Sequence, residues 1–269
     1  MFILLSVANK NMKKLSLLAL MFILGINVFA QNEKTITISG RAIDFNGNPI
    51  DSCWVAVYYS DFSTAYSAYT NNEGYYSIPN VAKGKYMAIY AIRPKEYPRM
   101  NAVPEEDMRL EFWAWNVIVD RDLVINPRYH RLELYGTTVF KQNGGYPSLI
   151  IYTRPMSLGK HLSYGQEIWE NKNNSETEEI DISAEPDKIE FKVYADNIPL
   201  KIQSVQPVRE YVGGGRQMAY LIYVDLPNKP DKYCIIRVEA FNNAYGGEYG
   251  ENIYFYEMPT YENNTDASR

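Results

Sequence analysis

Along most of the chain, apolar and polar residues alternate with a period of two, and clusters of Gly, Asn and Pro interrupt this alternation at short intervals. Three such clusters, at 46–49, 71–74 and 83–85, divide residues 38–90 into four short runs. Because successive side chains of a strand point to opposite faces, each run predicts a strand with one buried face. Turn residues between alternating runs are typical of hairpins, so the pattern predicts an all-β fold.

The second of these predicted strands separates small apolar residues from large aromatic ones. Cys53, Val55 and Val57 share one phase of the alternation, and Trp54 and Tyr58 share the other. The small apolar set is the better core face. Trp54 and Tyr58 are therefore expected on the outward face.

A strand predicted at 110–115 follows a proline-containing segment, 93–107, which is expected to be a long loop. If Phe112 and Ala114 face the core, Trp113 and Trp115 share the other face, with side chains about 7 Å apart along the strand. Two coplanar indoles at that spacing could stack on successive sugar rings. The alternative is that a second domain or the loop covers both indoles.

The second half of the chain continues the alternation, beginning with a short apolar run at 149–152. Later runs each combine an apolar phase with a mostly polar one, at 189–194, 220–225, 234–239 and 252–257. This pattern predicts a two-sheet sandwich of a generally immunoglobulin-like kind. The intervening stretch 166–188 has eight acidic residues against two lysines and is expected to be a solvated loop.

Five short motifs follow one another in the first half: Ser39-Gly40-Arg41, Gly47-x-Pro49-Ile50, Val55-x-Val57, Thr70-x-x-x-Gly74-x-Tyr76-x-Ile78 and Gly84-x-Tyr86. In this order they resemble the carboxypeptidase regulatory-like domain, a transthyretin-like (prealbumin-like) β-sandwich. The resemblance covers roughly residues 34–142. Similar domains stand at the front of bacterial outer-membrane receptors and beside carbohydrate-active enzymes, but the fold alone implies little about activity.

The expected organisation is therefore two tandem β-sandwich domains, the first prealbumin-like and the second immunoglobulin-like. Residues 1–30 are expected to be a signal peptide, and 259–269 a polar tail. The first sandwich is assigned to 34–142 and the second to 147–258, with a linker between them. Runs at 122–126 and 130–135 are expected to be the last strands of the first sandwich.

The signal peptide is predicted from Lys13 and Lys14, which precede an apolar run that ends in Val28-Phe29-Ala30. The true start is either Met1 or Met12. An apolar stretch of about fourteen residues is short for a membrane span, so no stable span is expected after cleavage. The protein is expected to be exported to the periplasm or the cell exterior.

The charge balance limits the classes of partner. The chain has 27 basic and 32 acidic residues, a net charge of −5. Removal of the signal peptide takes three lysines and no acids, which leaves a net charge of −8. An acidic surface argues against nucleic acid or an anionic membrane as a partner.

Residues with catalytic or metal-binding chemistry are few. The two cysteines, Cys53 and Cys234, are expected to be buried thiols in different domains rather than a disulfide. His130 and His161 fit no triad or zinc spacing. The run Asp44-x-Asn46-x-Asn48 resembles the start of a calcium loop, but position twelve is Val55, which has no side-chain oxygen, so a turn is expected. No enzyme activity, metal or cofactor is predicted.

Two functions fit these observations. The first is a glycan-binding accessory protein of the bacterial cell envelope. Its ligand-binding residues would be Trp113, Trp115, Trp54 and Tyr58, with Glu111 and Arg131 available for hydroxyl groups. The second is a structural or protein-interaction component of the envelope, in which the same aromatic residues form an interface. A polysaccharide or a cell-envelope protein is accordingly the expected partner.

Overall fold

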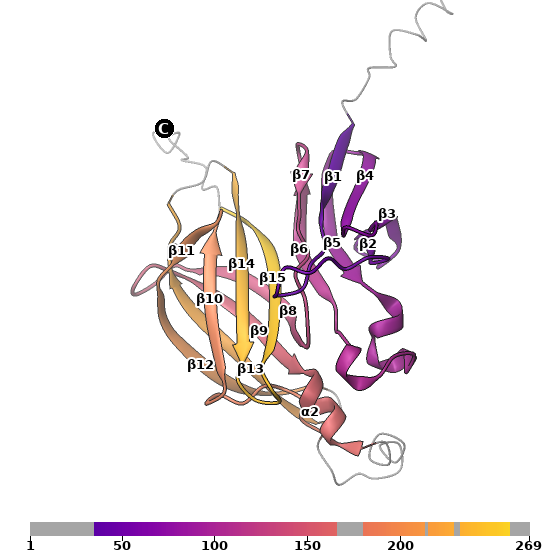
Figure 1. The fold of residues 1–269 in the computed structure, drawn as a ribbon. Helices are drawn as coiled ribbons and strands as arrows, with labels where there is room; N and C mark the ends of the chain where they lie inside the picture. Colours follow the sequence, from indigo (N-terminus) through magenta and orange to yellow (C-terminus); the bar gives the residue numbers. More distant parts are fainter. Residues whose placement is uncertain (1–34, 166–179, 213–214, 229–231, 259–269) are drawn as a thin grey trace, which may run out of the picture. The chain divides into compact units, whose positions relative to one another are not determined.

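The computed structural model describes residues 35–165, 180–212, 215–228 and 232–258. Strands dominate these residues and form sheets of three, eight and four strands (Figure 1). The prediction of an all-β chain with two tandem β-sandwiches is confirmed. The predicted signal peptide, the polar tail and residues 166–179 of the acidic stretch lie outside the described residues.

The three sheets have simple strand orders. The smallest contains β4 (Tyr75–Val81), β1 (Ile36–Arg41) and β7 (Leu123–Val124), in that order. The eight-stranded sheet has the order β11 (Ile198–Leu200), β10 (Ile189–Ala195), β14 (Tyr233–Asn242), β15 (Glu248–Glu257), β6 (Phe112–Val119), β5 (Gly84–Ile92), β2 (Trp54–Tyr58) and β3 (Thr64–Tyr69). The third contains β12 (Ile202–Tyr211), β13 (Arg216–Asp225), β9 (Ser148–Ser157) and β8 (Leu132–Gln142).

The first hydrophobic core lies between the three-stranded sheet and strands β2, β5 and β6 of the large sheet. Val55, Val57, Phe112 and Ala114 are fully buried in it, as their phase in the sequence predicts. Cys53 lies in the same core as a free thiol. Burial raises the pKa of the Cys53 thiol to about 11, so this sulfur is held neutral.

The second core lies between the four-stranded sheet and strands β10, β14 and β15. Ile222, Ile236 and Val238 are fully buried there, and so is Cys234, which is also a free thiol. The prediction of two buried, unbridged cysteines is thus confirmed. Strand β8 pairs only with β9 in this second sandwich, so the prediction that 130–135 closes the first sandwich was wrong.

Strand β15 belongs to both cores. It pairs with β14 on one side and, in parallel, with β6 on the other, where Asn252 lies opposite Trp113. Ile253 and Phe255 point into the first core, and Tyr256 points into the second. Since neighbouring strand residues face opposite ways, the two smaller sheets cover opposite faces of the large sheet.

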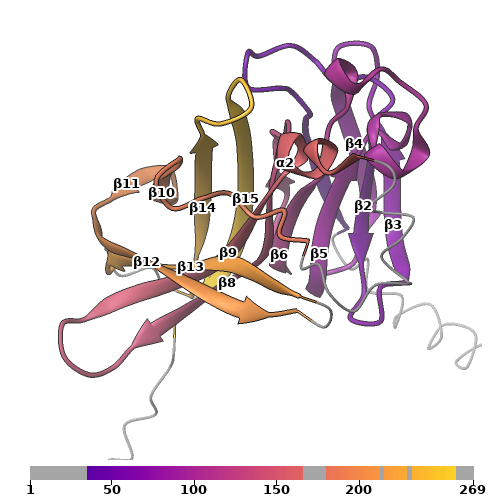
Figure 2. The same ribbon diagram turned by 90° about the horizontal axis from the view of Figure 1, so that it is seen from below.

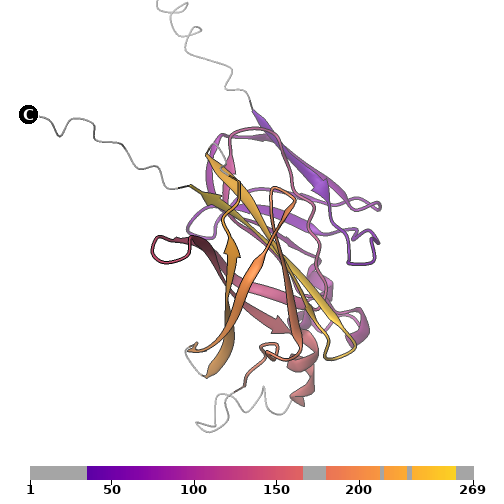
Figure 3. The same ribbon diagram turned by 90° about the vertical axis from the view of Figure 1, so that its left-hand side faces the viewer.

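The four-stranded sheet crosses the large sheet closely at β15 (Figures 2 and 3). An added Cβ atom at Gly250 would lie 2.2 Å from the backbone oxygen of Leu132 in β8, so only glycine permits this approach. In addition, Asn252 Nδ2 donates a hydrogen bond of 2.8 Å to the Leu134 carbonyl. These contacts fix β8 against β15.

Short helices occur in the connecting segments. The segment predicted to be a proline loop contains three 3-10 turns, η1 (Pro94–Glu96), η2 (Pro98–Met100) and η3 (Glu105–Asp107). An α-helix, α2 (Leu158–Ser163), follows β9 directly. Within the part of the chain that the structure describes, no helix has the length and apolar character needed to cross a membrane.

Candidate functional site

Aromatic side chains gather on the face of the large sheet that points away from the first core. Trp54 and Tyr58 come from β2, Tyr90 comes from β5, and Trp113 and Trp115 come from β6. All five are half-buried. We refer to these five residues as the aromatic face. It unites the four residues singled out from the sequence and adds Tyr90 of β5, which was not among them.

The rings of the aromatic face pack on one another. The ring centroids of Trp113 and Trp115 are 4.6 Å apart with planes 7° from parallel, so the indoles are stacked. Trp113 also lies 4.4 Å from Tyr90, and Trp54 meets Tyr58 edge to face at 83°. The two indoles share one face of the strand, as expected, but the expectation that their rings lie side by side in one plane was wrong. Stacking turns ring faces toward each other, and a sugar ring needs a free face.

Glu111 connects the aromatic face to the second sandwich. Its Oε1 accepts a hydrogen bond of 2.9 Å from Trp113 Nε1, and its Oε2 accepts one of 2.7 Å from the Tyr90 hydroxyl. Burial, followed by the charge of Glu111, raises the pKa of Tyr90, so this phenol stays a donor. Arg131, the other polar residue suggested from the sequence, instead donates to the Glu105 carbonyl at 2.6 Å.

Glu133 of β8 lies close enough to Glu111 for the two carboxyl groups to interact electrostatically. The Glu133 side chain is buried, with 3% of the residue exposed. Burial is the main cause that raises the pKa of Glu133 well above its ordinary value, and the charge of Glu111 adds to it. Because Glu111 accepts two hydrogen bonds and Glu133 is the more deeply buried of the two, we assign the proton to Glu133.

A cavity of about 560 Å³ lies beside Glu133. Its apolar lining comes from Leu110, Met156, Leu158, Ile180 and Ile182, and its polar lining comes from Tyr97, Arg99, Glu133, Ser157, His161 and Gln217. This volume falls in the range of small-molecule sites. No pattern in the sequence indicates this cavity, because its lining residues come from segments far apart in the chain.

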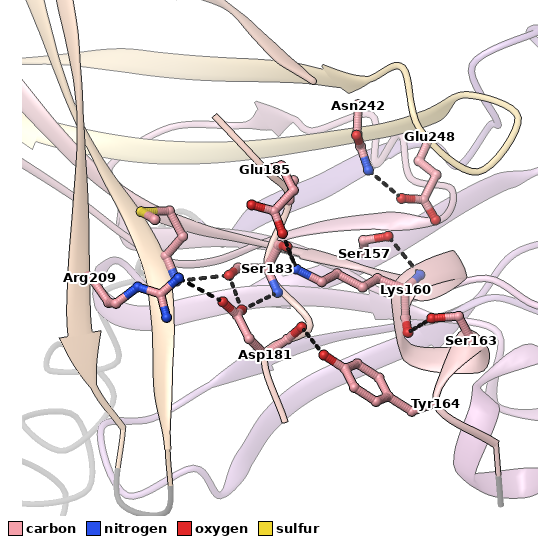
Figure 4. A network of polar contacts seen from close by, with 12 residues as sticks. Ser157, Lys160, Ser163, Tyr164, Asp181, Ser183, Glu185, Arg209, Asn242 and Glu248 are labelled. Atoms are coloured by element: carbon pink, nitrogen blue, oxygen red, sulfur yellow. Dashed lines mark hydrogen bonds and ion pairs between the residues drawn. The ribbon is translucent and has the colours of Figure 1, made fainter. Parts of the chain in front are cut away.

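Polar contacts hold one wall of the cavity in place (Figure 4). Lys160 Nζ, on α2, donates to the Ser183 carbonyl at 3.0 Å and also pairs with Glu185. The Tyr164 hydroxyl donates to the Asp181 carbonyl at 2.9 Å. These bonds tie α2 to the segment that carries Ile180 and Ile182, so the wall is fixed by the fold.

Strand β3 lies at one end of the eight-stranded sheet and pairs only with β2 there. Its sequence, Thr-Ala-Tyr-Ser-Ala-Tyr, contains no charged residue and no proline. Tyr69 at its end is 66% exposed, and Phe62 in the preceding turn is 61% exposed. Solvent-exposed aromatic residues therefore border an unpaired strand edge.

The remaining candidates from the sequence have structural roles. Asp44 Oδ1 accepts hydrogen bonds of 2.8 Å from the backbone N–H groups of Asn46 and Asn48, which confirms the predicted turn. Burial, followed by the charge of Arg131, lowers the pKa of His130. His161 lines the cavity. Within the described ranges, no group of three or more His, Cys, Asp or Glu residues is arranged to hold a metal ion.

Comparison with known proteins gives no family. No protein-family model matches the chain, and no curated protein matches it. Among solved structures, the chain is similar to BcpA, the major pilin subunit of Bacillus cereus, with 9% identity, a TM-score of 0.26, and coverage of 82% of this chain and 69% of that one.

Two other solved structures also match. For the T6 backbone pilin of serotype M6 Streptococcus pyogenes, the identity is 7% and the TM-score 0.18, with coverage of 82% of this chain and 64% of that one. For Dpr2 Ig1-Ig2 in complex with DIP-Theta Ig1-Ig3, the identity is 11% and the TM-score 0.19, with 82% and 53% covered. TM-scores this low do not transfer a role to the chain.

Proposed function

We propose that this protein is an exported, non-catalytic structural component of the bacterial cell envelope. It assembles when β3 of one copy pairs, edge to edge, with β3 of a second copy. The single observation that carries this proposal is the uncharged, proline-free edge of β3. Export rests on the predicted signal peptide.

The other terminal strands of the three sheets all carry features that discourage edge pairing. Pro79, Pro199 and Pro207 interrupt β4, β11 and β12, and β7 has only two residues. Strand β8 has a register shift and is bound to β15. Proline, short strands, bulges and covering elements are the usual protections of sheet edges. Strand β3 also has a register shift, at Ala65, but among the described terminal strands it is the one that combines six residues with no proline and no charge.

The sequence of β3 is complementary to itself in an antiparallel pair. A twofold axis at Ser67 lies within the regularly paired part of the strand, Tyr66–Tyr69, and places Tyr66 opposite Ala68, so that a large ring lies over a small side chain. The strand has no charge, so no like charges oppose each other. Phe62 and Tyr69 would then be covered by the second copy, which accounts for their exposure in the single chain.

Glycan binding is the competing function. Stacked and edge-to-face rings in the aromatic face leave few free ring faces for a sugar. The geometry of the aromatic face therefore does not favour glycan binding. Exposed aromatic residues such as those beside β3 are also enriched at protein interfaces, which fits the proposed contact between two copies.

The test is the oligomeric state of the chain from Gln31 onward, measured by light scattering after gel filtration over a range of concentrations. We expect a dimer for the wild type. Ser67→Lys places two positive charges directly opposite each other at the twofold axis, and we expect a monomer. Ser67→Glu alone should also be monomeric, whereas an equimolar mixture of the two variants should dimerise again.

Ser204→Lys is the matched control, because Ser204 is an exposed serine on the proline-containing edge strand β12. We expect this variant to remain a dimer. A wild type that stays monomeric throughout, or a Ser67→Lys dimer as stable as the wild type, would contradict the proposal. Retention of a monomeric wild type on a polysaccharide matrix would favour glycan binding instead.

A further inference from the structure

The sequence contains two Asn-Gly pairs, Asn46-Gly47 and Asn143-Gly144. In such a pair the backbone nitrogen of the glycine can attack the side-chain amide of the asparagine, because glycine has no Cβ atom to hinder the approach. Both asparagines are exposed. Exposure therefore does not distinguish the two pairs, and the difference between them lies in their hydrogen bonds.

Hydrogen bonds hold the first pair in its turn. The Gly47 N–H donates to the Asp44 carbonyl at 3.1 Å, and the Asn46 N–H donates to Asp44 Oδ1 at 2.8 Å. Asp44 itself is buried, so the acceptor side of the turn is fixed by the fold. The Gly47 nitrogen can attack the Asn46 amide only after this turn has opened, which makes the reaction slow in the folded chain.

The second pair lies at the tip of the hairpin formed by β8 and β9. Residues 143–147, which connect the end of β8 to the start of β9, are all exposed. Within the described ranges, neither the Asn143 side chain nor the Gly144 N–H makes a hydrogen bond. An added Cβ atom at Gly144 would meet nothing within 4 Å, so the tip has room to rearrange. The Gly144 nitrogen is therefore available to attack the Asn143 amide.

We propose that Asn143 is a site of spontaneous deamidation, which converts it to isoaspartate and aspartate while Asn46 remains an asparagine. The Gly144 nitrogen attacks Cγ of Asn143 and forms a new C–N bond. The proton of the Gly144 nitrogen passes to the side-chain nitrogen, which leaves as ammonia. Water then adds to either carbonyl carbon of the resulting cyclic imide, and the C–N bond at that carbon breaks. Water is the only co-reactant, so the reaction needs no enzyme.

The modification changes the charge and the backbone of the hairpin tip. Each event adds one negative charge to a chain that has 32 acidic residues against 27 basic ones. Isoaspartate also inserts a methylene carbon into the main chain, but the tip lies beyond the last pair of the ladder, Gln142 with Ser148, so the strands stay paired. The site belongs to the four-stranded sheet and is separate from the β3 edge. The protein thus becomes more acidic with age.

The test is peptide mass spectrometry of the chain from Gln31 onward, kept folded in a mildly alkaline buffer and sampled over several weeks. Replacement of the amide NH2 by OH identifies deamidation, and chromatography separates the isoaspartyl peptide from the aspartyl one. A sample unfolded in guanidinium chloride gives the rate of each pair without the fold. We expect Asn143 to react equally fast in both samples, and Asn46 to react about tenfold more slowly when folded, since its turn must lose a hydrogen bond.

Two variants serve as controls. Gly144→Ala places a Cβ atom in open space, so the fold stays intact while the attack is hindered, and deamidation of Asn143 should slow several-fold. Asn143→Gln should stop the reaction at this position, because the longer side chain must close a larger ring, and it should leave Asn46 unchanged. An Asn143 that stays unmodified in the folded chain, or two asparagines that the fold protects equally, would overturn the proposal.

Discussion

The protonation of Glu133 can be read from the pH dependence of stability. The pKa of this carboxyl is raised in the fold, mainly by burial and then by the charge of Glu111. A group with a raised carboxyl pKa keeps its proton in the folded chain at pH values where the unfolded chain has released it. The free energy of unfolding therefore falls as pH rises between the unfolded and folded pKa values. That window opens at the ordinary value of 4.5.

Glu133→Gln removes this effect. The amide has nearly the same size and shape as the protonated carboxyl group, but it does not titrate. Each retained proton contributes a slope of about 1.4 kcal/mol per pH unit. The stability of the variant relative to the wild type should therefore increase with pH above 4.5, by up to about 1.4 kcal/mol per unit, until the folded-state pKa is passed.

The assay is urea denaturation of both proteins at a series of pH values from 4 to 8, with the free energy of unfolding extrapolated to water. Comparison at each pH cancels the titration of groups that the two proteins share. Glu106→Gln, at an exposed site in η3, is the matched control for the loss of one carboxyl. A difference that does not change with pH would refute the assignment of the proton to Glu133. So would a difference that falls with pH, because it would mean an ionised, stabilised Glu133.

Two further predictions concern the same region. Glu111→Gln leaves one acceptor oxygen for two donors, Trp113 Nε1 and the Tyr90 hydroxyl. It should therefore lower the free energy of unfolding, measured by urea denaturation, by about 1–3 kcal/mol and by more than Glu133→Gln does. An equal or smaller decrease would contradict the role of Glu111 as the charged partner. Gly250→Ala forces a Cβ atom against the β8 backbone and should lower the free energy of unfolding by about 1–3 kcal/mol or more. Gly144→Ala, where an added Cβ atom meets nothing within 4 Å, should cost much less, and similar costs for the two variants would show that the contact between β8 and β15 is absent.

Local periodicity predicted the strands and their inward faces well. Val55, Val57, Phe112 and Ala114 are buried as the alternation requires, and Trp113 and Trp115 share the opposite face. Both cysteines are buried thiols. These properties depend on the two-residue repeat of a strand, which a single sequence contains.

Properties that depend on contacts between segments far apart in the chain could not be predicted from local periodicity. Nothing near Trp113 in the sequence indicates that Asn252 lies opposite it in a parallel pair. The Glu133 side chain is buried near Glu111 and Arg99, which come from other segments of the chain, so its position in an alternating run could not predict that it keeps its proton. The stacking of the indoles depends on rotamers that neighbouring strands select, and strand spacing alone predicted the wrong geometry.

The double role of β15 has a consequence for the order of events during synthesis. Asn116 of β6 donates a hydrogen bond to the carbonyl of Phe255, a residue 139 positions later, so the outer partner of β6 emerges long after β6 itself. Until then, the uncharged run Phe-Trp-Ala-Trp-Asn-Val-Ile-Val is an exposed edge in a partly made chain. Such a segment is prone to pair with neighbouring chains. Rapid completion of the chain, or a chaperone that shields β6, would protect this edge until β15 has been made.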